Sequence, residues 1–263
     1  MLARQRQDAI LEEVRRAGAV RVHELATRLR VSDMTVRRDL DALARRGLVD
    51  KVYGGATSVT GPKVDEPGFE AKSVRALAQK LAIAQRAADL VLPGTAIGLG
   101  AGTTTWTLAR CLDSVPDLTV VTNSVKVSDV LQRAGRSDRT VMLTGGLRTP
   151  SDALVGPVAV RTLRGLHLDQ VFLGAHGVEM DAGFTTPNME ESEVNRALVG
   201  AGGSLVVLAD HSKWGTVGIS TFAELDEAEA LVTDDGLDEE ASELLNETVG
   251  ELIVARVPEE AAG

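Results

Sequence analysis

From residue 70 onward the sequence alternates short apolar runs with longer helical segments, and this alternation constrains the fold more than any other feature. The short runs, rich in β-branched residues, are Ala96–Leu99, Leu118–Val121, Thr140–Leu143, Gln170–Leu173, Leu205–Leu208, Ala230–Val232 and Leu252–Val254. Continuous apolar runs of this length are typical of parallel strands that are buried on both faces. The intervening helices are predicted over Lys72–Leu92, Thr104–Leu112, Ser124–Ala134, Met189–Ala201 and Asp238–Thr248. Alternating strands and helices predict an α/β domain built on an open, mostly parallel sheet.

The first 56 residues follow a different pattern, which predicts three short helices between residues 3 and 46. The second helix runs from about Val22 to Leu29, and Ser32 is a good N-cap for the third, which ends near Arg46 before Gly47. Two short helices joined by a tight turn and followed by a longer one are typical of a helix-turn-helix.

Residues 58–69 separate the two patterns and are expected to form a linker. They contain two prolines and two glycines and have almost no apolar periodicity. The expected organisation is therefore a helix-turn-helix domain over residues 1–57, a linker over 58–69 and an α/β domain over 70–257.

Charge is distributed unevenly between these parts. The whole chain has a net charge of −10, but residues 1–56 hold 12 Arg and Lys against 8 Asp and Glu, a net charge of +4. The remaining residues hold 16 basic and 30 acidic side chains, a net charge of −14. A basic segment on an acidic body indicates that a polyanion such as duplex DNA would meet only the N-terminal part.

The third predicted helix has one apolar face and one basic face. At helical spacing, Val36, Leu40 and Leu43 share the core side, and Arg38 and Arg45 lie opposite them. The basic residues could be a solvated surface, but the helix-turn-helix spacing and the local positive charge favour DNA. A recognition helix fits the major groove with its first turns facing the base edges.

The residues expected to contact DNA are Ser32, Thr35, Arg37, Arg38 and Arg45. We expect Thr35 and Arg38 at base edges, and the other three at the phosphate backbone. Arg37 has acidic residues four positions away on both sides, so ion pairing on a solvated helix is the alternative interpretation of that residue.

A glycine-rich segment, Gly98–Thr105, follows the first predicted strand of the α/β domain and opens a helix. Glycines let the backbone approach an anion, and a helix N-terminus presents free N–H groups to it. A nucleotide-binding P-loop would need a lysine at the helix start, and a dinucleotide fingerprint would need a third glycine where Thr103 stands. The interpretations that remain are a site for a small phosphorylated ligand and a tight glycine turn capped by threonines.

These residues together resemble the DeoR family of bacterial transcription regulators. In the N-terminal part the resemblance is carried by Arg6, Ile10, Val14, Ser32, Thr35, Val36, Arg37, Arg38, Asp39 and Leu40, and by the segment Gly47–Ala56. In the α/β part it is carried by Gly102–Thr104, Thr122–Ser124, Gly145–Gly146 and Asp210–Lys213. The similarity spans nearly the whole chain.

The resemblance implies a winged helix-turn-helix and a sensor domain with a fold like that of ribose-phosphate isomerases and glucosamine-phosphate deaminases. It implies a sugar-metabolism repressor whose partners are double-stranded operator DNA and a phosphorylated sugar or related effector, acting as a homo-oligomer, dimer or tetramer. The residues that it assigns to the effector are Gly102, Thr103, Thr104, Asn123, Gly145, Gly146 and Lys213. Glu191 or Glu193 could accept sugar hydroxyls, unless they belong to a solvated helix face.

Two other functions fit parts of the sequence. A sugar-phosphate isomerase or deaminase could use Asp210, Glu191 and Lys213 as acid and base, but it would leave the basic N-terminal part unexplained. A DNA-binding protein with an empty sensor would bind no sugar phosphate. We expect a regulator and not an enzyme.

No cofactor, metal site or membrane partner is expected. The four histidines lack the spacing of metal ligands, and no apolar run approaches the ~18 residues of a membrane span. A single cysteine and the lack of an export signal indicate the cytoplasm.

Overall fold

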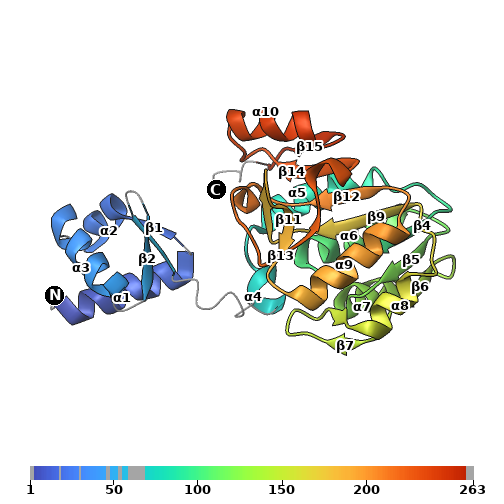
Figure 1. Cartoon of the computed structure of the whole chain (residues 1–263), viewed down its shortest axis with the longest axis horizontal. Coiled ribbons are helices and arrows are strands. Elements are labelled where there is room, and N and C mark those ends of the chain that lie inside the picture. Colours follow the sequence, from blue (N-terminus) through green and yellow to red (C-terminus); the bar gives the residue numbers. More distant parts are fainter. Residues whose placement is uncertain are drawn as a thin grey trace. The chain divides into compact units, whose positions relative to one another are not determined.

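The computed structural model describes residues 3–17, 19–29, 31–45, 48–52, 55–58 and 69–258. The chain divides into two compact units, Met1–Asp65 and Glu66–Gly263 (Figure 1). We call them the N-terminal unit and the sensor unit, and describe each by itself.

The N-terminal unit contains three helices and a small antiparallel sheet. Its elements are α1 (Ala3–Ala17), β1 (Ala19–Arg21), α2 (Val22–Leu29), α3 (Asp33–Arg45), β2 (Val49–Val52) and β3 (Gly55–Ser58). The strands lie in the order β1-β3-β2, so the hairpin β2–β3 follows α3 as a wing. Ile10 of α1, Leu25 of α2, and Val36, Leu40 and Leu43 of α3 are at most 3% exposed and form the core. The predicted winged helix-turn-helix is confirmed.

The sensor unit is built on a sheet of seven parallel strands. In spatial order they are β15 (Leu252–Ala255), β14 (Ala230–Asp234), β12 (Leu205–Leu208), β9 (Gln170–Gly174), β4 (Ala96–Leu99), β5 (Thr119–Thr122) and β6 (Thr140–Leu143). All six neighbouring pairs are parallel. Every apolar run predicted as a strand is therefore found, and the expected mostly parallel open sheet is confirmed.

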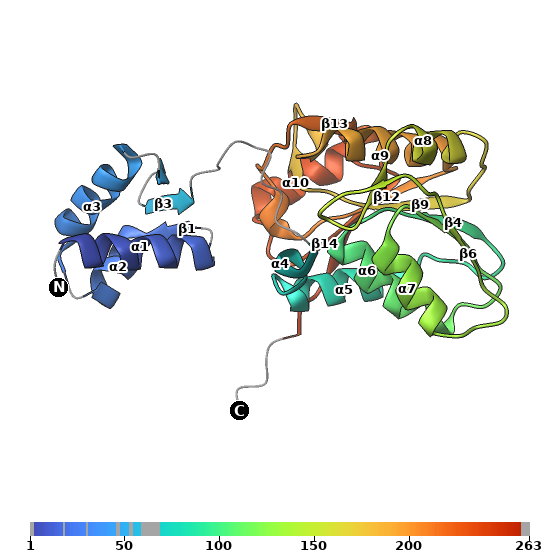
Figure 2. The ribbon, with the colours of Figure 1, turned by 90° about the horizontal axis from the view of Figure 1, so that it is seen from below.

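Helices cover both faces of this sheet. One face packs against α5 (Leu77–Ala88), α6 (Thr103–Cys111) and α7 (Val125–Arg133). The other packs against α8 (Pro157–Leu163), α9 (Met189–Ala201) and α10 (Glu239–Thr248) (Figure 2). Alternate residues of a strand belong to opposite cores, as Val206 and Val207 of β12 do. Burial on both faces explains why the strands read as continuous apolar runs.

Smaller strands and turns complete the sensor unit. A hairpin of β7 (Leu147–Arg148) and β8 (Leu154–Val155) follows β6. An antiparallel sheet of β10 (Gly177–Glu179), β11 (Gly183–Thr186) and β13 (Ser220–Ala223) lies beside α9. Short 3₁₀ turns occur at Leu112–Ser114, His211–Lys213 and Leu225–Glu227.

The start of the sensor unit differs from the single helix expected over Lys72–Leu92, and that prediction is wrong. A five-residue helix, α4 (Phe69–Ser73), precedes α5, and Ala76 between them has a left-handed φ of 49°. A left-handed residue cannot continue an α-helix, so the chain turns there. Phe69, the last residue of the expected linker, is 6% exposed and begins α4. The rest of that linker beyond Ser58 lies outside the described residues.

Candidate functional site

The start of α3 is fixed by Ser32. Its hydroxyl accepts a hydrogen bond from the backbone N–H of Thr35 at 3.3 Å, and its carbonyl accepts from the N–H of Val36 at 3.1 Å. The hydroxyls of Ser32 and Thr35 are 2.9 Å apart. Ser32 is thus the N-cap that the sequence predicts. The two hydroxyls lie together in the first turn, where a recognition helix meets DNA.

A buried carboxylate on α3 ties this helix to α1. Asp39 is 4% exposed, and it accepts hydrogen bonds from Nε of Arg6 at 2.5 Å and from Nε2 of Gln7 at 3.1 Å. Arg6, one of the residues that carry the family resemblance, therefore holds α1 against α3. Because charge-assisted hydrogen bonds are strong, this pair sets the position of α3 on the N-terminal core.

The outer face of α3 carries the predicted base and phosphate contacts. Arg37 and Arg38 are exposed, and neither forms an ion pair with any side chain that the structure describes. Met34 is 62% exposed beside them. Arg45 is the last residue of α3, and its side chain lies outside the described part. The helix thus presents two available guanidinium groups on the side opposite its core.

In the sensor unit, the candidate effector residues follow the carboxyl ends of the parallel strands. The chain runs from β4 to β5 and β6 in one direction, then returns to the other side of β4 with β9 and continues to β12. The order therefore reverses between β4 and β9. Open α/β sheets bind ligands at such a switch point, outside the carboxyl ends of the strands.

The glycine-rich loop connects β4 to α6 at this switch point. The N–H of Gly100 donates to the carbonyl of Phe172 in β9 at 3.0 Å, and the carbonyl of Gly102 accepts from the N–H of Trp106 and the hydroxyl of Thr105. Among the described residues, the hydroxyls of Thr103 and Thr104 have no hydrogen-bond partner, although these residues are only 9% and 8% exposed. No side chain caps α6, so its first N–H groups remain available to an anion.

Asn123, at the end of β5, is next to this loop, but its amide is occupied. Its Oδ1 accepts from the N–H of Ala101 at 2.9 Å and its Nδ2 donates to the carbonyl of Leu154 at 3.2 Å. The side chain is 1% exposed. Asn123 therefore holds the glycine loop against β8.

Gly145 and Gly146 follow β6 and have φ values of 76° and 122°. A Cβ on Gly146 would lie 2.4 Å from the carbonyl oxygen of Val155, so the glycine allows the close approach of β7 to β8. The close backbone approach that the sequence predicts at Gly146 is thus an approach to the backbone of β8. Since neighbouring strands are ~5 Å apart, the ends of β6 and β12 lie ~20 Å from each other, and these glycines are distant from Lys213.

Lys213 belongs to the 3₁₀ turn after β12, and buried carboxylates fix that turn. Asp210 is 3% exposed and accepts hydrogen bonds from the N–H and the hydroxyl of Ser212. Asp234, at the end of β14, is 1% exposed and binds the N–H of His211 at 2.7 Å and its Nδ1 at 2.6 Å. Gly236 packs on the imidazole, because a Cβ there would lie 2.3 Å from Nδ1. Lys213 has no ion pair among the described residues.

Lys80 is a candidate functional residue that the sequence analysis did not single out. It is 6% exposed, and burial lowers its pKa to about 8; Asp210 opposes this effect, and Lys213, Arg75 and Lys72 add to it. Lys80 thus lies within electrostatic range of three other cations and of one carboxylate, that of Asp210 just after β12. Its spacing from Ile83, Ala84 and Ala87 places it on the buried stripe of α5, and this was the signal available in the sequence.

The two glutamates considered for sugar hydroxyls have different environments. Glu191 is 9% exposed, and its Oε1 accepts hydrogen bonds from the hydroxyls of Thr149, at 2.9 Å, and Ser151. Glu193 is exposed on α9 and lines a surface hollow of about 370 Å³ between α8 and α9. Glu191 therefore holds the β7–β8 turn to α9.

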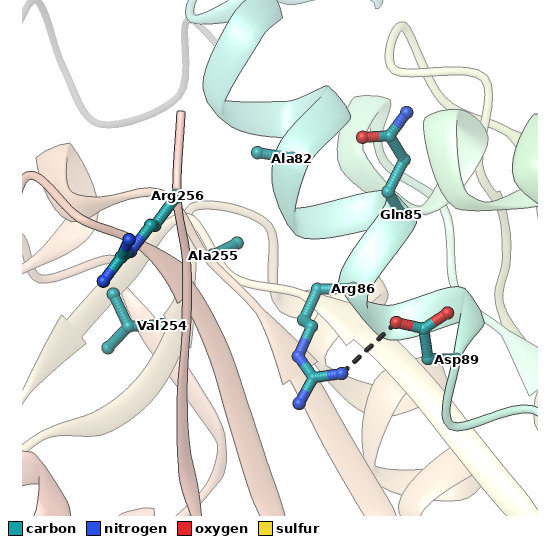
Figure 3. Close-up of a pocket in the computed structure, with 7 residues that line it drawn as sticks. All are labelled: Ala82, Gln85, Arg86, Asp89, Val254, Ala255 and Arg256. Atoms are coloured by element: carbon teal, nitrogen blue, oxygen red, sulfur yellow. Dashed lines mark hydrogen bonds and ion pairs between the residues drawn. The ribbon is translucent and has the colours of Figure 1, made fainter. Parts of the chain in front are cut away.

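Two surface hollows lie away from the glycine loop. The one between α5 and β15, about 290 Å³, contains an ion pair of Arg86 and Asp89 at 3.2 Å (Figure 3). Neither this hollow nor the one between α8 and α9 is lined by Thr103, Thr104 or Lys213. We place the candidate site at the strand ends because the glycine loop, its available donors and Lys213 are found there. In the described part of the chain, no group of three or more His, Cys, Asp or Glu could hold a metal, and no helix is long and apolar enough to cross a membrane.

Comparison with known families identifies both units. The family described as the DeoR-like helix-turn-helix domain matches residues 6–61, and the DeoR C terminal sensor domain matches residues 75–235. A helix-turn-helix unit followed by an α/β sensor defines a DNA-binding transcriptional regulator. The chain belongs to the DeoR family of these regulators.

Similar proteins match over nearly the full chain. The HTH-type transcriptional regulator YgbI of Escherichia coli (strain K12) is 38% identical over 97% of this chain and 99% of its own length. The HTH-type transcriptional regulator GlpR of Haloferax volcanii is 35% identical over 97% and 98%. The lactose phosphotransferase system repressor of Staphylococcus epidermidis is 35% identical over 87% and 91%.

Solved structures match more distantly. Ribose 5-phosphate isomerase A from Neisseria gonorrhoeae is 19% identical, with a TM-score of 0.38 over 52% of this chain and 53% of the isomerase, about half its length. The translation initiation factor eIF-2B of Pyrococcus horikoshii OT3 is 14% identical, with a TM-score of 0.43 over 81% and 67%.

Proposed function

We propose that this regulator is a repressor of carbohydrate-metabolism genes that a phosphorylated sugar or a related metabolite controls. Recognition helix α3 binds operator DNA, with Thr35 and Arg38 at base edges and Ser32, Arg37 and Arg45 at phosphates. The sensor unit binds the effector at Gly102, Thr103, Thr104 and Lys213, to which we add Lys80. The protein acts in the cytoplasm, together with the DNA that it binds.

The DNA half of the proposal is supported by the availability of the basic side chains. Arg37 and Arg38 are exposed on a helix that Ser32 caps and Asp39 fixes. One helix-turn-helix unit buries little surface on DNA, and tight binding normally uses two half-sites. A homo-oligomer that pairs two N-terminal units meets this requirement.

The observation that carries the effector half is the charge at the strand ends. The sensor part has a net charge of −14 over the residues after 56, yet Lys72, Arg75 and Lys213 all lie within electrostatic range of Lys80, together with the carboxylate of Asp210. The N-terminus of α6 and two available threonine hydroxyls lie at the same sheet edge. Such a set of donors suits a phosphate group, and one relative is named a lactose phosphotransferase system repressor.

The environments of the acid–base candidates also agree with a regulator that has no catalytic activity. The carboxylate of Glu191 is bonded to two hydroxyls and that of Asp210 to Ser212, so both have structural partners. We expect no turnover of ribose or glucosamine phosphates by the purified protein. Turnover that follows the protein through purification would contradict this part of the proposal.

The proposal is tested in two steps with the full chain. Duplexes are first selected from a random library, and the selected duplex is titrated by fluorescence anisotropy. The protein is then heated with a panel of sugar phosphates and with the matching unphosphorylated sugars. A ligand at 100 times its Kd stabilises by about 2.7 kcal/mol, which a thermal shift detects. We expect shifts with phosphorylated sugars only.

Paired variants connect the shift to the site. Thr103→Val and Thr104→Val remove the available hydroxyls and should weaken the shift, whereas Thr248→Val in α10 makes the same change away from the site. Failure to select any duplex refutes the DNA half of the proposal. A full panel without a shift refutes the effector half.

A further inference from the structure

The short helix α4 is the first described element of the sensor unit, and it is held by contacts with α6 and α7. The ring of Phe69 meets Trp106 of α6 edge-on, with centroids 5.8 Å apart. Lys126 of α7 lies 5.3 Å from the Phe69 ring and bonds Glu70 at 3.0 Å. A helix of five residues is not stable alone, so these contacts and those of α5 must hold it.

The contact from α5 is made by Lys80. Its ammonium donates hydrogen bonds to the carbonyls of Lys72 and Arg75, both at 2.7 Å. One carbonyl lies in α4 and the other lies in the turn before α5. Lys80 therefore links α4 to α5 across the turn that separates the two helices.

The turn between α4 and α5 is itself strained. Ala76 has φ 49° and ψ 45°, a left-handed conformation that disfavours any residue with a Cβ. Residues in such conformations persist where their surroundings hold them. Here Lys80 bonds the carbonyls of Lys72 and Arg75 on the N-terminal side of Ala76, and its backbone N–H donates to the carbonyl of Ala76 itself.

The ammonium of Lys80 is only weakly stabilised by these two carbonyls. It is a buried ammonium whose hydrogen-bond acceptors are neutral; Asp210 attracts it, and Lys213, Arg75 and Lys72 repel it. An anion would form stronger hydrogen bonds with it than two carbonyls do. An anionic group bound beside Lys213 would thus compete for the same ammonium.

We propose that Lys80 is the coupling contact of the sensor: it transfers hydrogen bonds from the carbonyls of Lys72 and Arg75 to the anionic group of the effector, and α4 loosens. This rests on the proposed effector site and adds how that site is regulated. α4 is the first described element of the sensor unit after the DNA-binding unit, so its loosening adds residues 69–73 to the chain between the two units. A longer connecting chain lowers the effective concentration of one N-terminal unit at the second half-site.

The test is hydrogen exchange of the α4 amides in the full chain, with inorganic phosphate as the probe and chloride at matched ionic strength as its control. In the wild type, phosphate should speed exchange over residues 69–73 about tenfold, while the amides of β4 keep their rates. Lys80→Met should give fast α4 exchange without phosphate and no further response to it. Arg86→Met, on the exposed side of the same helix, should behave as the wild type.

A second variant keeps the test decisive if Lys80→Met does not fold. Lys126→Met removes the Glu70 and Phe69 contacts but leaves Lys80 intact, so its α4 should exchange faster and still respond to phosphate. An unchanged α4 rate in wild-type protein with phosphate, or a normal response in Lys80→Met, overturns the coupling. If phosphate raises the Tm while α4 exchange stays constant, the effector site stands and only the coupling fails; no change in either quantity refutes both.

Discussion

Buried charges set the roles of single residues in both units. Asp39 fixes the recognition helix through Arg6 and Gln7, and Asp210 and Asp234 fix the turn that carries Lys213. Exposed charges, by contrast, are the available ones: Arg37 and Arg38 project from α3. These buried carboxylates therefore position the structure, whereas the exposed arginines of α3 are available to DNA.

Arg38 provides the direct test of base contact. Arg38→Ala should weaken binding to the selected duplex by about 1–3 kcal/mol and relax the preference at one base pair, because an arginine fork on guanine is lost. Arg37→Ala should weaken binding to all duplexes equally and lower the salt dependence. Anisotropy titrations at several salt concentrations measure both. Equal losses on specific and random duplexes for Arg38→Ala would remove it from the base contacts.

Lys80 gives the sensor unit a defined pH dependence. Its pKa is lowered by burial to about 8, from 10.5 in the unfolded chain. Between these values the unfolded chain binds more protons, so the free energy of unfolding rises with pH. The charged lysine costs stability below pH 8, on the order of 3 kcal/mol, and this cost disappears toward pH 10.5.

Urea unfolding of wild-type protein and Lys80→Met across this pH range checks the sign. The stability of the wild type relative to the variant should increase from pH 8 to pH 10.5. Parallel pH profiles for the two proteins would mean that Lys80 is not buried as a cation.

At the scale of elements, the hydrophobic pattern predicts the sheet but not the pieces attached to it. The inner strands were predictable because two cores bury both faces of each, as in β12 and β4. The edge strand β6 was predictable from its apolar residues, although most of its residues are exposed. The hairpin β7–β8 and helix α8 were not, because they are short and partly exposed. Likewise, nothing local marks the break at Ala76, where the chain is left-handed and Lys80 bonds the carbonyls of Lys72 and Arg75, eight and five residues earlier in the chain.

The same distinction applies to the candidate site. Ser32 as N-cap follows from sequence spacing alone. The occupied amide of Asn123 and the packing of Gly146 on Val155 depend on which segments become neighbours, which no local pattern records. Lys80 was recognisable, since it stands on the buried stripe of its helix.

Gly146 is predicted to be intolerant of any side chain. Gly146→Ala would place a Cβ 2.4 Å from the backbone oxygen of Val155 at a φ of 122°. We expect a loss of about 2–4 kcal/mol in the free energy of unfolding. Gly165→Ala, where a Cβ would meet nothing within 4 Å, is the matched control and should change little. Equal stability of the two variants in urea unfolding would refute the packing role.

For the whole molecule, the uneven distribution of charge separates DNA binding from effector binding along the chain. The segment with net charge +4 can approach DNA, whereas the part with net charge −14 is repelled by it. An effector can control DNA binding only if it binds the two states of the chain with different affinity. A hundredfold difference in effector affinity corresponds to about 2.7 kcal/mol of control.

The most direct test measures this control. The full chain is titrated onto its selected duplex with and without a saturating amount of the sugar phosphate that gives the largest thermal shift. We predict at least about tenfold weaker DNA binding with the sugar phosphate, and normal DNA binding without response in a Thr103→Val, Thr104→Val double variant. Identical DNA affinity with and without a bound sugar phosphate would contradict the account.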